Sequence, residues 1–523
     1  MIKTKAIEKE MAEMKKKTVK TNLLLENKKM EKEKRMEQKN EEEKEFVTLI
    51  DNMGKEHNAV IRIKKVVLDN FKNVGHGEIV LNCGREFVSQ GTESDILGIY
   101  GQNGSGKTSF VEALAILKSL MRGAPVPIIY VESVAVGADC AKLEFVFDIQ
   151  YPNGLVREAT YSFNMGIEPL TKDEIYEYSS KFNRLPDKDN KVVIYNEKFS
   201  LIWEDASKRQ LIIDTSSEEV PFTPDTKRKE LIGTEMQILG ALKFIKQSAR
   251  ENSKSFIFTK DVFEILANKN SNSIPFMVLT ELRYFAHHCF YVIDTKSSGL
   301  IRLNFALPVY TKRREKILFD STSKIDVVAD VFDEIKLEIE NISCVLEQLV
   351  PGLTLKLELK EGEHRLSRTG KPIVTAELKA SRDGVDLPLH YESDGIRKII
   401  SVLGLIIEAF NHPSVTVAID EFDAGIFEYL LGEILQAFEE SGKGQFIFTS
   451  HNLRPLEVIN KKFLCFTTTS PKNRYIRLKN ISATNNLRDT YFREIVLCEQ
   501  EEEIYKKTKR FKMVAALKKV GGK

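Results

Sequence analysis

One octet of residues, GQNGSGKT at 101–108, constrains this chain more than any other feature. It satisfies the pattern G-x-x-x-x-G-K-[ST] in full, and it stands between a short apolar run, ILGIY at 96–100, and a segment with helical spacing at 107–121. Glycines at these positions let successive backbone N–H groups wrap a phosphate, and the start of the following helix adds its dipole. The octet therefore predicts a strand, a phosphate-binding loop and a helix, which together are a unit of an α/β fold.

The residue types in this loop also predict the ligand. Lys107 supplies a point charge for the β- and γ-phosphates of a nucleotide, and the Thr108 hydroxyl suits Mg²⁺. We therefore expect ATP and Mg²⁺ as cofactors, with Lys107 also contributing to catalysis. The alternative is an ordinary glycine-rich turn, which the flanking strand and helix disfavour. The residues expected to contact the nucleotide are Gly101, Gln102, Asn103, Gly104, Ser105, Gly106, Lys107, Thr108 and Ser109.

A second apolar run, VTVAI at 415–419, ends in Asp420 and Glu421. Buried strands hold carboxylates only at their ends, where solvent or a metal compensates the charge. Asp420 fits a role at Mg²⁺, either directly or through another group, and Glu421 fits the base that polarises an attacking water. Without the phosphate-loop motif, a solvated strand end would be the simpler interpretation.

Two further motifs follow the same logic. His451 closes the next expected strand, at 445–449, where an imidazole can hydrogen-bond a γ-phosphate, although a lone histidine is more often structural. Ser393 and Gly395 stand at the start of an expected helix, and a hydroxyl, a glycine backbone and a helix N-terminus together form an anion site. Ser393 is also a good N-cap, which is the structural alternative.

Composition excludes several classes of protein. Of the 523 residues 42% are hydrophobic and 29% are charged, so the chain can bury a core and is not wholly disordered. No run approaches the roughly 18–20 uncharged apolar residues of a membrane span, and the Lys- and Glu-rich N-terminus contains no secretory signal. The six cysteines form no C-x-x-C, which disfavours a zinc ribbon or a disulfide scaffold. We expect a cytoplasmic protein without membrane contact, and the net charge of +2 does not indicate a nucleic-acid binder.

Charge composition and hydrophobic patterning divide the chain into five segments. Its first 50 residues carry 14 basic and 11 acidic side chains, which predicts a charged helical arm, either solvated or in contact with a partner or a second copy. Strands are expected at 126–132, 142–150 and 156–164, and a hairpin with Gly75 and Gly77 at its turn precedes the phosphate loop. The segments are the arm at 1–50, the first half of a nucleotide-binding head at 51–165, a mixed α/β insertion at 166–385, the second half of the head at 386–480 and a charged helical tail at 481–523.

Together these motifs resemble the heads of ABC-type ATPases, over roughly residues 59–165 and 386–480. The resemblance implies an α/β head with a mixed sheet around the phosphate loop, an antiparallel lobe and a mixed α+β insertion before the signature motif. It also implies an ATP-bound homodimer of heads, within a higher homo-oligomer, in which Ser393 and Gly395 of one subunit contact the γ-phosphate held by the other. In this resemblance Lys107 and Thr108 correspond to Walker A, Asp420 and Glu421 to Walker B, and His451 to the switch histidine.

Two departures from that family's pattern matter. The signature segment reads ESDGIRK instead of the transporter-like L-S-G-G-Q, which disfavours a membrane transporter head. The glutamine that usually follows the lobe strands has no clear counterpart, and Gln150 is the nearest candidate.

A finer resemblance points to a biological role. The segments LDNFKNVGHGEIVLN, GIYGQNGSGKTSFVEAL, SDGIRKI and IDEFDAGIFEYLL are similar to soluble ABC ATPases of the OLD and abortive-infection type, many of which serve bacterial anti-phage defence. The residues after His451 contain no D-x-D, so we expect no Toprim nuclease domain. The resemblance implies the ATPase subunit of a two-component system such as PARIS, which controls a separate nuclease or toxin when a phage protein or DNA is detected. Two alternatives stay open: a DNA-binding ATPase of repair or recombination type, and a nuclease in its own right, for which Arg283 and His288, spaced R-x4-H, are a weak indication.

Overall fold

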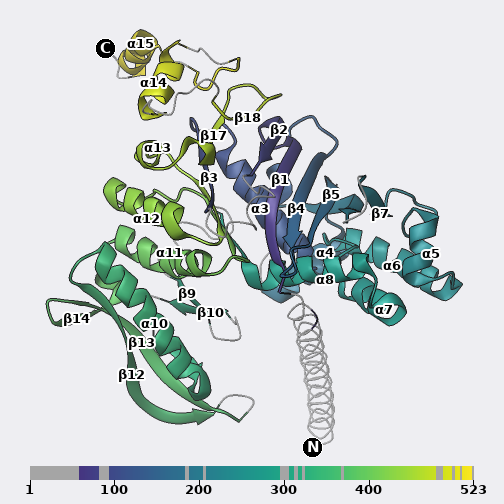
Figure 1. Cartoon of the computed structure of the whole chain (residues 1–523), viewed down its shortest axis with the longest axis horizontal. Helices are drawn as coiled ribbons and strands as arrows, with labels where there is room; N and C mark the ends of the chain where they lie inside the picture. Colours follow the sequence, from purple (N-terminus) through teal and green to yellow (C-terminus); the bar gives the residue numbers. More distant parts are fainter. Residues whose placement is uncertain are drawn as a thin grey trace, which may run out of the picture. The chain divides into compact units, whose positions relative to one another are not determined.

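The computed structural model describes residues 53, 58–81, 94–182, 188–203, 208–294, 306–310, 316–320, 324–366, 370–478, 487–497, 501–506 and 509–520. The chain divides into two units, Met1–His57 and Asn58–Lys523. The charged arm expected at 1–50 lies outside the described residues. Figure 1 labels most of the helices and strands of the second unit.

A six-stranded sheet forms the core of the second unit, in the order β18-β17-β3-β16-β15-β8. The strands from β17 to β8 are parallel, and β18 is antiparallel to β17. Every residue of β3, β15 and β16 is buried, as expected for parallel strands covered on both faces. The predicted α/β fold class is therefore confirmed. The strands are β3 (Asp95–Tyr100), β8 (Phe290–Ile293), β15 (Thr416–Ile419), β16 (Gln445–Thr449), β17 (Leu464–Thr467) and β18 (Tyr475–Ile476).

Helices pack against this sheet and join it to the rest of the unit. α11 (Asp394–Asn411) and α12 (Glu428–Ser441) bury their apolar sides with β16 in one core cluster. α3 (Lys107–Met121) follows the phosphate loop and contacts β8 and β15. The buried Glu112 of α3 also pairs with Lys72, at the β1–β2 turn of a second sheet, at 2.9 Å. α3 therefore contacts both sheets, which explains why it is buried on nearly all its faces.

The second sheet is antiparallel, with the order β2-β1-β4-β5-β6-β7. It confirms the strands predicted at 142–150 and 156–164. The strand predicted at 126–132 is wrong, because Ile128–Ser133 forms the 3₁₀ helix η1, which begins after Pro127 and buries Tyr130. The strands are β1 (Val60–Phe71), β2 (Val74–Val80), β4 (Ala141–Gln150), β5 (Val156–Pro169), β6 (Asn190–Ile202) and β7 (Gln210–Asp214).

Gly75 and Gly77 do not form the hairpin turn that the sequence predicted. The turn between β1 and β2 lies at residues 72–73, and both glycines lie inside β2. They serve close packing, because a Cβ on Gly75 would come within 2.7 Å of the Pro471 carbonyl oxygen. A Cβ on Gly77 would come within 2.6 Å of the Tyr475 ring.

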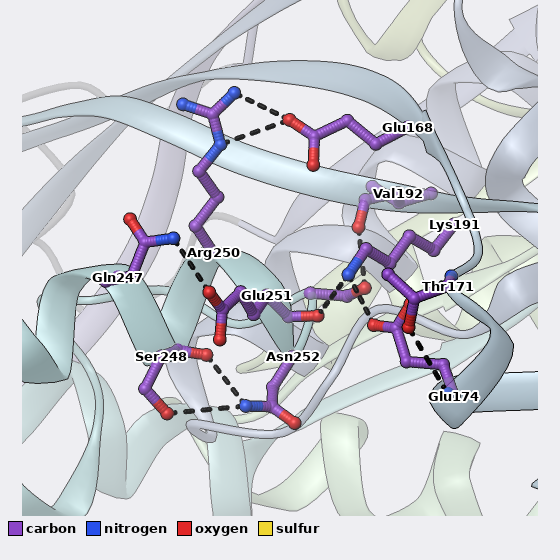
Figure 2. Close-up of polar contacts among 11 residues, drawn as sticks. Glu168, Thr171, Glu174, Lys191, Val192, Gln247, Ser248, Arg250, Glu251 and Asn252 are labelled. Carbon is purple, nitrogen blue, oxygen red and sulfur yellow. Dashed lines mark hydrogen bonds and ion pairs between the residues drawn. The ribbon is translucent and has the colours of Figure 1, made fainter. Parts of the chain in front are cut away.

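A layer of helices is fastened to the antiparallel sheet by polar contacts (Figure 2). Arg250 on α6 pairs with Glu168 on β5 at 2.6 Å. Lys191 on β6 pairs with Glu174 on α4, and it also donates to the Glu251 carbonyl oxygen at 2.9 Å. These charges neutralise one another at the seam. The helices are α4 (Lys172–Phe182), α5 (Asp225–Ile232), α6 (Met236–Glu251), α7 (Lys260–Asn270) and α8 (Ile274–Tyr284), followed by the π-helical turn η2 (Phe285–Cys289).

The residues between β8 and α11 build a smaller layer in which a helix lies against a four-stranded sheet (Figure 1). α10 buries apolar residues at helical spacing, from Phe332 through Ile335, Ile339 and Ile342 to Leu346, in the same core cluster as β12 and β13. The elements are β11 (Ile325–Val328), α10 (Ala329–Leu349), β12 (Leu353–Leu366), β13 (Pro372–Arg382), β14 (Val385–Pro388) and η3 (Leu389–Tyr391), with the separate hairpin β9 (Ala306–Tyr310) and β10 (Lys316–Asp320).

The end of the chain returns to the phosphate loop. Within the described residues it contains α13 (Pro455–Val458), η4 (Lys461–Phe463), α14 (Leu487–Leu497) and α15 (Arg510–Val520). Ile504 is buried, and the Lys506 N–H donates to Gln102 Oε1 of the phosphate loop at 2.9 Å. None of the helices in the described part of the chain is both long and apolar enough to span a bilayer.

Candidate nucleotide-binding and catalytic site

Three loops meet at the carboxyl edge of the core sheet, because the strands that precede them are parallel neighbours. The loops are residues 101–106 after β3, 420–425 after β15 and 450–452 after β16. Thr108 Oγ1, in the first turn of α3, lies 3.4 Å from Asp420 Oδ1, although 312 positions separate the two residues in the chain. The fold therefore brings the phosphate loop and the acidic pair to one place.

The phosphate loop has a curled backbone that requires glycine. Gly101, Gly104 and Gly106 have φ angles of 150°, 74° and 102°, and residues other than glycine rarely adopt these values. A Cβ on Gly101 would overlap the hydroxyl of Thr467 on β17. Around Gly104, by contrast, no heavy atom of the described residues lies within 4 Å of where a Cβ would stand. The loop is thus closed on the side of the sheet and open at its mouth.

Lys107 is folded over this loop. Its Nζ donates to the carbonyl oxygens of Gly101 at 2.8 Å and Gln102 at 3.1 Å, and the residue is 5% exposed. Burial lowers the pKa of Lys107 to about 8, although the carboxylates of the 420–423 loop oppose this shift. Two carbonyl dipoles compensate a buried ammonium only in part, so an anion beside Lys107 would restore its charged form.

The remaining side chains of the loop differ in their surroundings. Ser105 and Ser109 are buried, and their hydroxyls bond the Gln102 carbonyl oxygen at 2.6 Å and Asn73 Oδ1 at 3.1 Å. These two hydroxyls therefore help to shape the loop. Asn103 is exposed at the mouth of the loop.

Thr449, the last residue of β16, ties the acidic pair together. Its hydroxyl donates to Asp420 Oδ1 at 2.6 Å and accepts from the Glu421 N–H at 2.8 Å. Asp420 is 1% exposed, whereas Glu421 is half-buried. Glu421 has a left-handed φ of 49°, an uncommon conformation for a residue other than glycine. The sequence analysis missed Thr449, and its position at the end of the strand beside Asp420 is the signal that could have found it.

Asp423 fixes the loop that carries the candidate switch histidine. Its Oδ2 accepts from the backbone N–H groups of His451 at 3.0 Å and Asn452 at 2.8 Å. Burial and the charge of Lys107 lower the pKa of His451, which favours a neutral imidazole, while the carboxylates of the 420–423 loop act in the opposite direction. Asp423 is a second residue that the sequence analysis missed, although DEFD shows a carboxylate two positions after Glu421.

The candidate signature residues lie at the start of α11. Ser393 is exposed and caps the helix, because its Oγ accepts from the Ile396 N–H at 3.4 Å. Gly395 packs directly on Gly425, where a Cβ would overlap the Gly425 carbonyl oxygen. Among the described residues, no hydrogen bond joins Ser393 or Gly395 to residues 101–109. Both the capping alternative and an anion site facing outward are compatible with this geometry.

The residues present fit a magnesium nucleotide. In the described ranges no three His, Cys, Asp or Glu side chains gather closely enough to hold a metal by themselves. Mg²⁺ at a nucleotide takes only one or two protein oxygens, since phosphates and water supply the others. The hydroxyl of Thr108 and the carboxylate of Asp420 are suitable oxygen donors, and the open mouth at Gly104 beside Lys107 leaves room for phosphates.

Two minor candidates from the sequence do not belong to this site. Gln150 lies at the end of β4, where it pairs with Val60, whereas the β1–β2 turn that contacts the phosphate loop is at the other end of β1. The strand that pairs with β15 on the side away from β16 is β8. The residue that follows β8 is Asp294, so this strand end also supplies no glutamine. Arg283 is buried, bonds the Phe258 carbonyl oxygen and lies over the Phe263 ring, which is a structural role.

Comparison with known proteins places the chain in a family. Residues 96–457 match the AAA_21 family, described as "AAA domain, putative AbiEii toxin, Type IV TA system". The match spans more than half of the chain, and the protein belongs to this family. Its family is one of AAA domains, so the chain contains an AAA-type ATPase domain. None of the curated proteins matches the sequence.

Solved structures show weaker likenesses. The SMC head domain from Thermotoga maritima is 14% identical, covers 80% of this chain and 100% of its own, and has a TM-score of 0.35. The Smc head domain with an extended coiled coil, bound to the C-terminal domain of ScpA derived from Pyrococcus furiosus, is 13% identical, covers 80% and 96%, and has a TM-score of 0.33. Similarity this weak carries no conclusion about activity or partners.

Proposed function

We propose that this protein binds Mg·ATP at the carboxyl edge of its core sheet and hydrolyses it between two heads. The observation that carries the proposal is the convergence of Lys107, Thr108, Asp420, Glu421 and His451 from three separate stretches of sequence. Bound Mg²⁺ would neutralise charge on the phosphates. Thr108 and Asp420 are the residues that would hold it.

Each remaining side chain has a distinct task in this proposal. The Lys107 ammonium would pair with oxygens of the β- and γ-phosphates. The Glu421 carboxylate would accept a proton from the attacking water. His451 in its neutral form keeps one N–H, which it would donate to a γ-phosphate oxygen. Its lowered pKa supports that form at neutral pH.

The signature residues support a dimer. Ser393 is exposed and makes no hydrogen bond to residues 101–109 of its own chain within the described ranges. A second head would bring its own Ser393 and the positive end of its α11 to the γ-phosphate. We therefore expect ATP-dependent homodimers, as part of a higher homo-oligomer.

The first experiment is the variant Glu421→Gln, which keeps the size and polarity of the side chain but removes the base. We expect ATP affinity within about threefold of wild type, kcat lowered on the order of 10²- to 10³-fold, and an ATP-bound dimer that accumulates in light scattering. The control Ser393→Arg should still bind ATP as a monomer but fail to dimerise. Wild-type turnover in Glu421→Gln would show that another residue is the base.

We also propose that this ATPase controls a separate nuclease or toxin in a cytoplasmic anti-phage defence system. The description of its family, which names a putative toxin and a toxin–antitoxin system, supports this role. The test is the native mass of the tagged protein purified from its host with Mg·ATP. A second protein in fixed stoichiometry is the expected result. A homo-oligomer that carries only nucleic acid would contradict it and favour DNA processing.

A further inference from the structure

Lys398, one turn beyond the signature residues on α11, is a buried lysine in an unusual position. It is 2% exposed, and among the described residues the single hydrogen bond of its Nζ goes to the backbone carbonyl oxygen of Glu421 at 2.6 Å. Burial lowers the pKa of Lys398 to about 8, although the carboxylates of Asp423, Glu421 and Asp420 oppose this shift. A buried ammonium is costly unless its surroundings compensate it, so the position is specific to the acidic loop.

The backbone of Glu421 is held from both sides. Its N–H donates to Thr449 Oγ1 at 2.8 Å, and its carbonyl oxygen accepts from Lys398. Between these two bonds the residue keeps a left-handed φ of 49°. A residue other than glycine keeps such a backbone conformation only when its surroundings impose it. Because the backbone conformation sets the direction of the Cα–Cβ bond, the two bonds also fix the direction from which the Glu421 side chain extends.

A second contact joins the same two segments. Gly395 packs so closely on Gly425 that a Cβ on Gly395 would overlap the Gly425 carbonyl oxygen. The start of α11 and the loop from Glu421 to Gly425 are thus fastened at both ends, by Lys398 at one and by Gly395 at the other. A displacement of the helix start would therefore move the backbone of Glu421 with it.

We propose that Lys398 is a positioning residue that sets the orientation of Glu421 and links it to the signature end of α11. This inference rests on the proposed function, in which Glu421 is the base and Ser393 meets the nucleotide of the partner. Through Lys398, the helix that contacts one nucleotide determines the backbone of the base that acts on the other. The two sites of a dimer are then coupled through this hydrogen bond and the Gly395–Gly425 contact.

The test compares Lys398→Met with Lys191→Met. Methionine keeps an unbranched side chain but has no hydrogen-bond donor. Lys191 serves as the control because it is also a mostly buried lysine, and its Nζ donates to the main-chain carbonyl oxygen of Glu251 at 2.9 Å. We expect Lys398→Met to lower kcat on the order of 30-fold with KM for ATP within about threefold, whereas Lys191→Met leaves both unchanged. Lys398→Arg restores a donor and should recover most of the lost kcat.

A double-mutant cycle separates positioning from general damage. If Lys398 acts through Glu421, adding Lys398→Met to Glu421→Gln should lower kcat less than twofold further. Full multiplication of the two losses would overturn the inference, as would a kcat for Lys398→Met equal to that of Lys191→Met. If Glu421→Gln itself turns over like wild type, the proposed function fails and the inference with it. If Glu421→Gln is inactive while Lys398→Met is normal, only the inference fails.

Discussion

The carboxyl edge of the core sheet and the seam beside α6 both contain mostly buried lysines, but these lysines have different hydrogen-bond and ion-pair partners. At the seam, Lys191 has a carboxylate partner in Glu174 and a carbonyl oxygen in Glu251 (Figure 2). At the carboxyl edge, Lys107 donates to two carbonyl oxygens of its own loop and forms no ion pair among the described residues, and burial lowers its pKa to about 8. The fold pairs Lys191 with a carboxylate, and we expect an anionic ligand to pair with Lys107.

The same contrast explains why the volume of a cavity does not by itself indicate a ligand site. A cavity of about 650 Å³ lies between β6 and α6. Two of the cations that line it are already engaged, because Lys246 donates to the Ser217 carbonyl oxygen at 2.7 Å and Arg250 pairs with Glu168. The phosphate loop differs, because its Lys107 forms no ion pair among the described residues. Incomplete compensation of charge is therefore the better indicator of a ligand site here.

The largest expected effect comes from removing the lysine that the fold leaves unsatisfied. Lys107→Ala should weaken ATP binding by at least about 1,000-fold, or about 4 kcal/mol, because no other ammonium group among the described residues bonds the loop. Titration calorimetry with a slowly hydrolysed ATP analogue measures it. In Lys191→Met the affinity should equal that of wild type. Equal losses in the two variants would erase the distinction between the two regions.

The second effect tests a buried carboxyl group in the helical layer. Burial raises the pKa of Glu281 to about 7, while hydrogen bonding from Tyr151 and the charge of Arg157 oppose the shift. The folded protein then holds a proton that the unfolded chain, with a pKa near 4.5, has lost. The stability contribution is complete below pH 4.5 and is lost as the pH rises towards 7.

Glu281→Gln should remove this pH dependence. Between pH 4.5 and 7.5 the free energy of unfolding of wild type should fall by up to about 3 kcal/mol relative to the variant. Urea unfolding at several pH values measures the difference, and ATP affinity should stay unchanged. Parallel curves for the two proteins would show that Glu281 titrates at its ordinary pKa in the folded state.

The smallest effect concerns the loop that Asp423 holds. Asp423→Ala removes the acceptor for the N–H groups of His451 and Asn452, so kcat should fall about tenfold, which corresponds to about 1.4 kcal/mol. Asp423→Asn keeps an acceptor oxygen and should recover part of that loss. Steady-state kinetics measures both. A kcat that is unchanged in Asp423→Ala would mean that the backbone of residues 450–452 is held without it.

Local spacing alone determined the α/β class and the candidate residues at strand ends. The octet at 101–108 needs only its own glycines and its flanks, and Asp420 and Glu421 need only the apolar run before them. Each such motif is contiguous, so short-range chemistry is enough to predict it. Their gathering at one edge followed from the rule that parallel strands end together.

Only the tertiary structure decided which distant groups complete the site. Thr449, Asp423 and Lys398 form hydrogen bonds to residues 23 to 29 positions away, and such bonds depend on strand register and helix rotation that no local pattern encodes. Gly75 and Gly77 also depend on tertiary contacts. From the sequence alone, a pair of glycines between strands predicts a turn. In the fold these glycines are required by the close approach of residues 471 and 475, about 400 positions further along the chain.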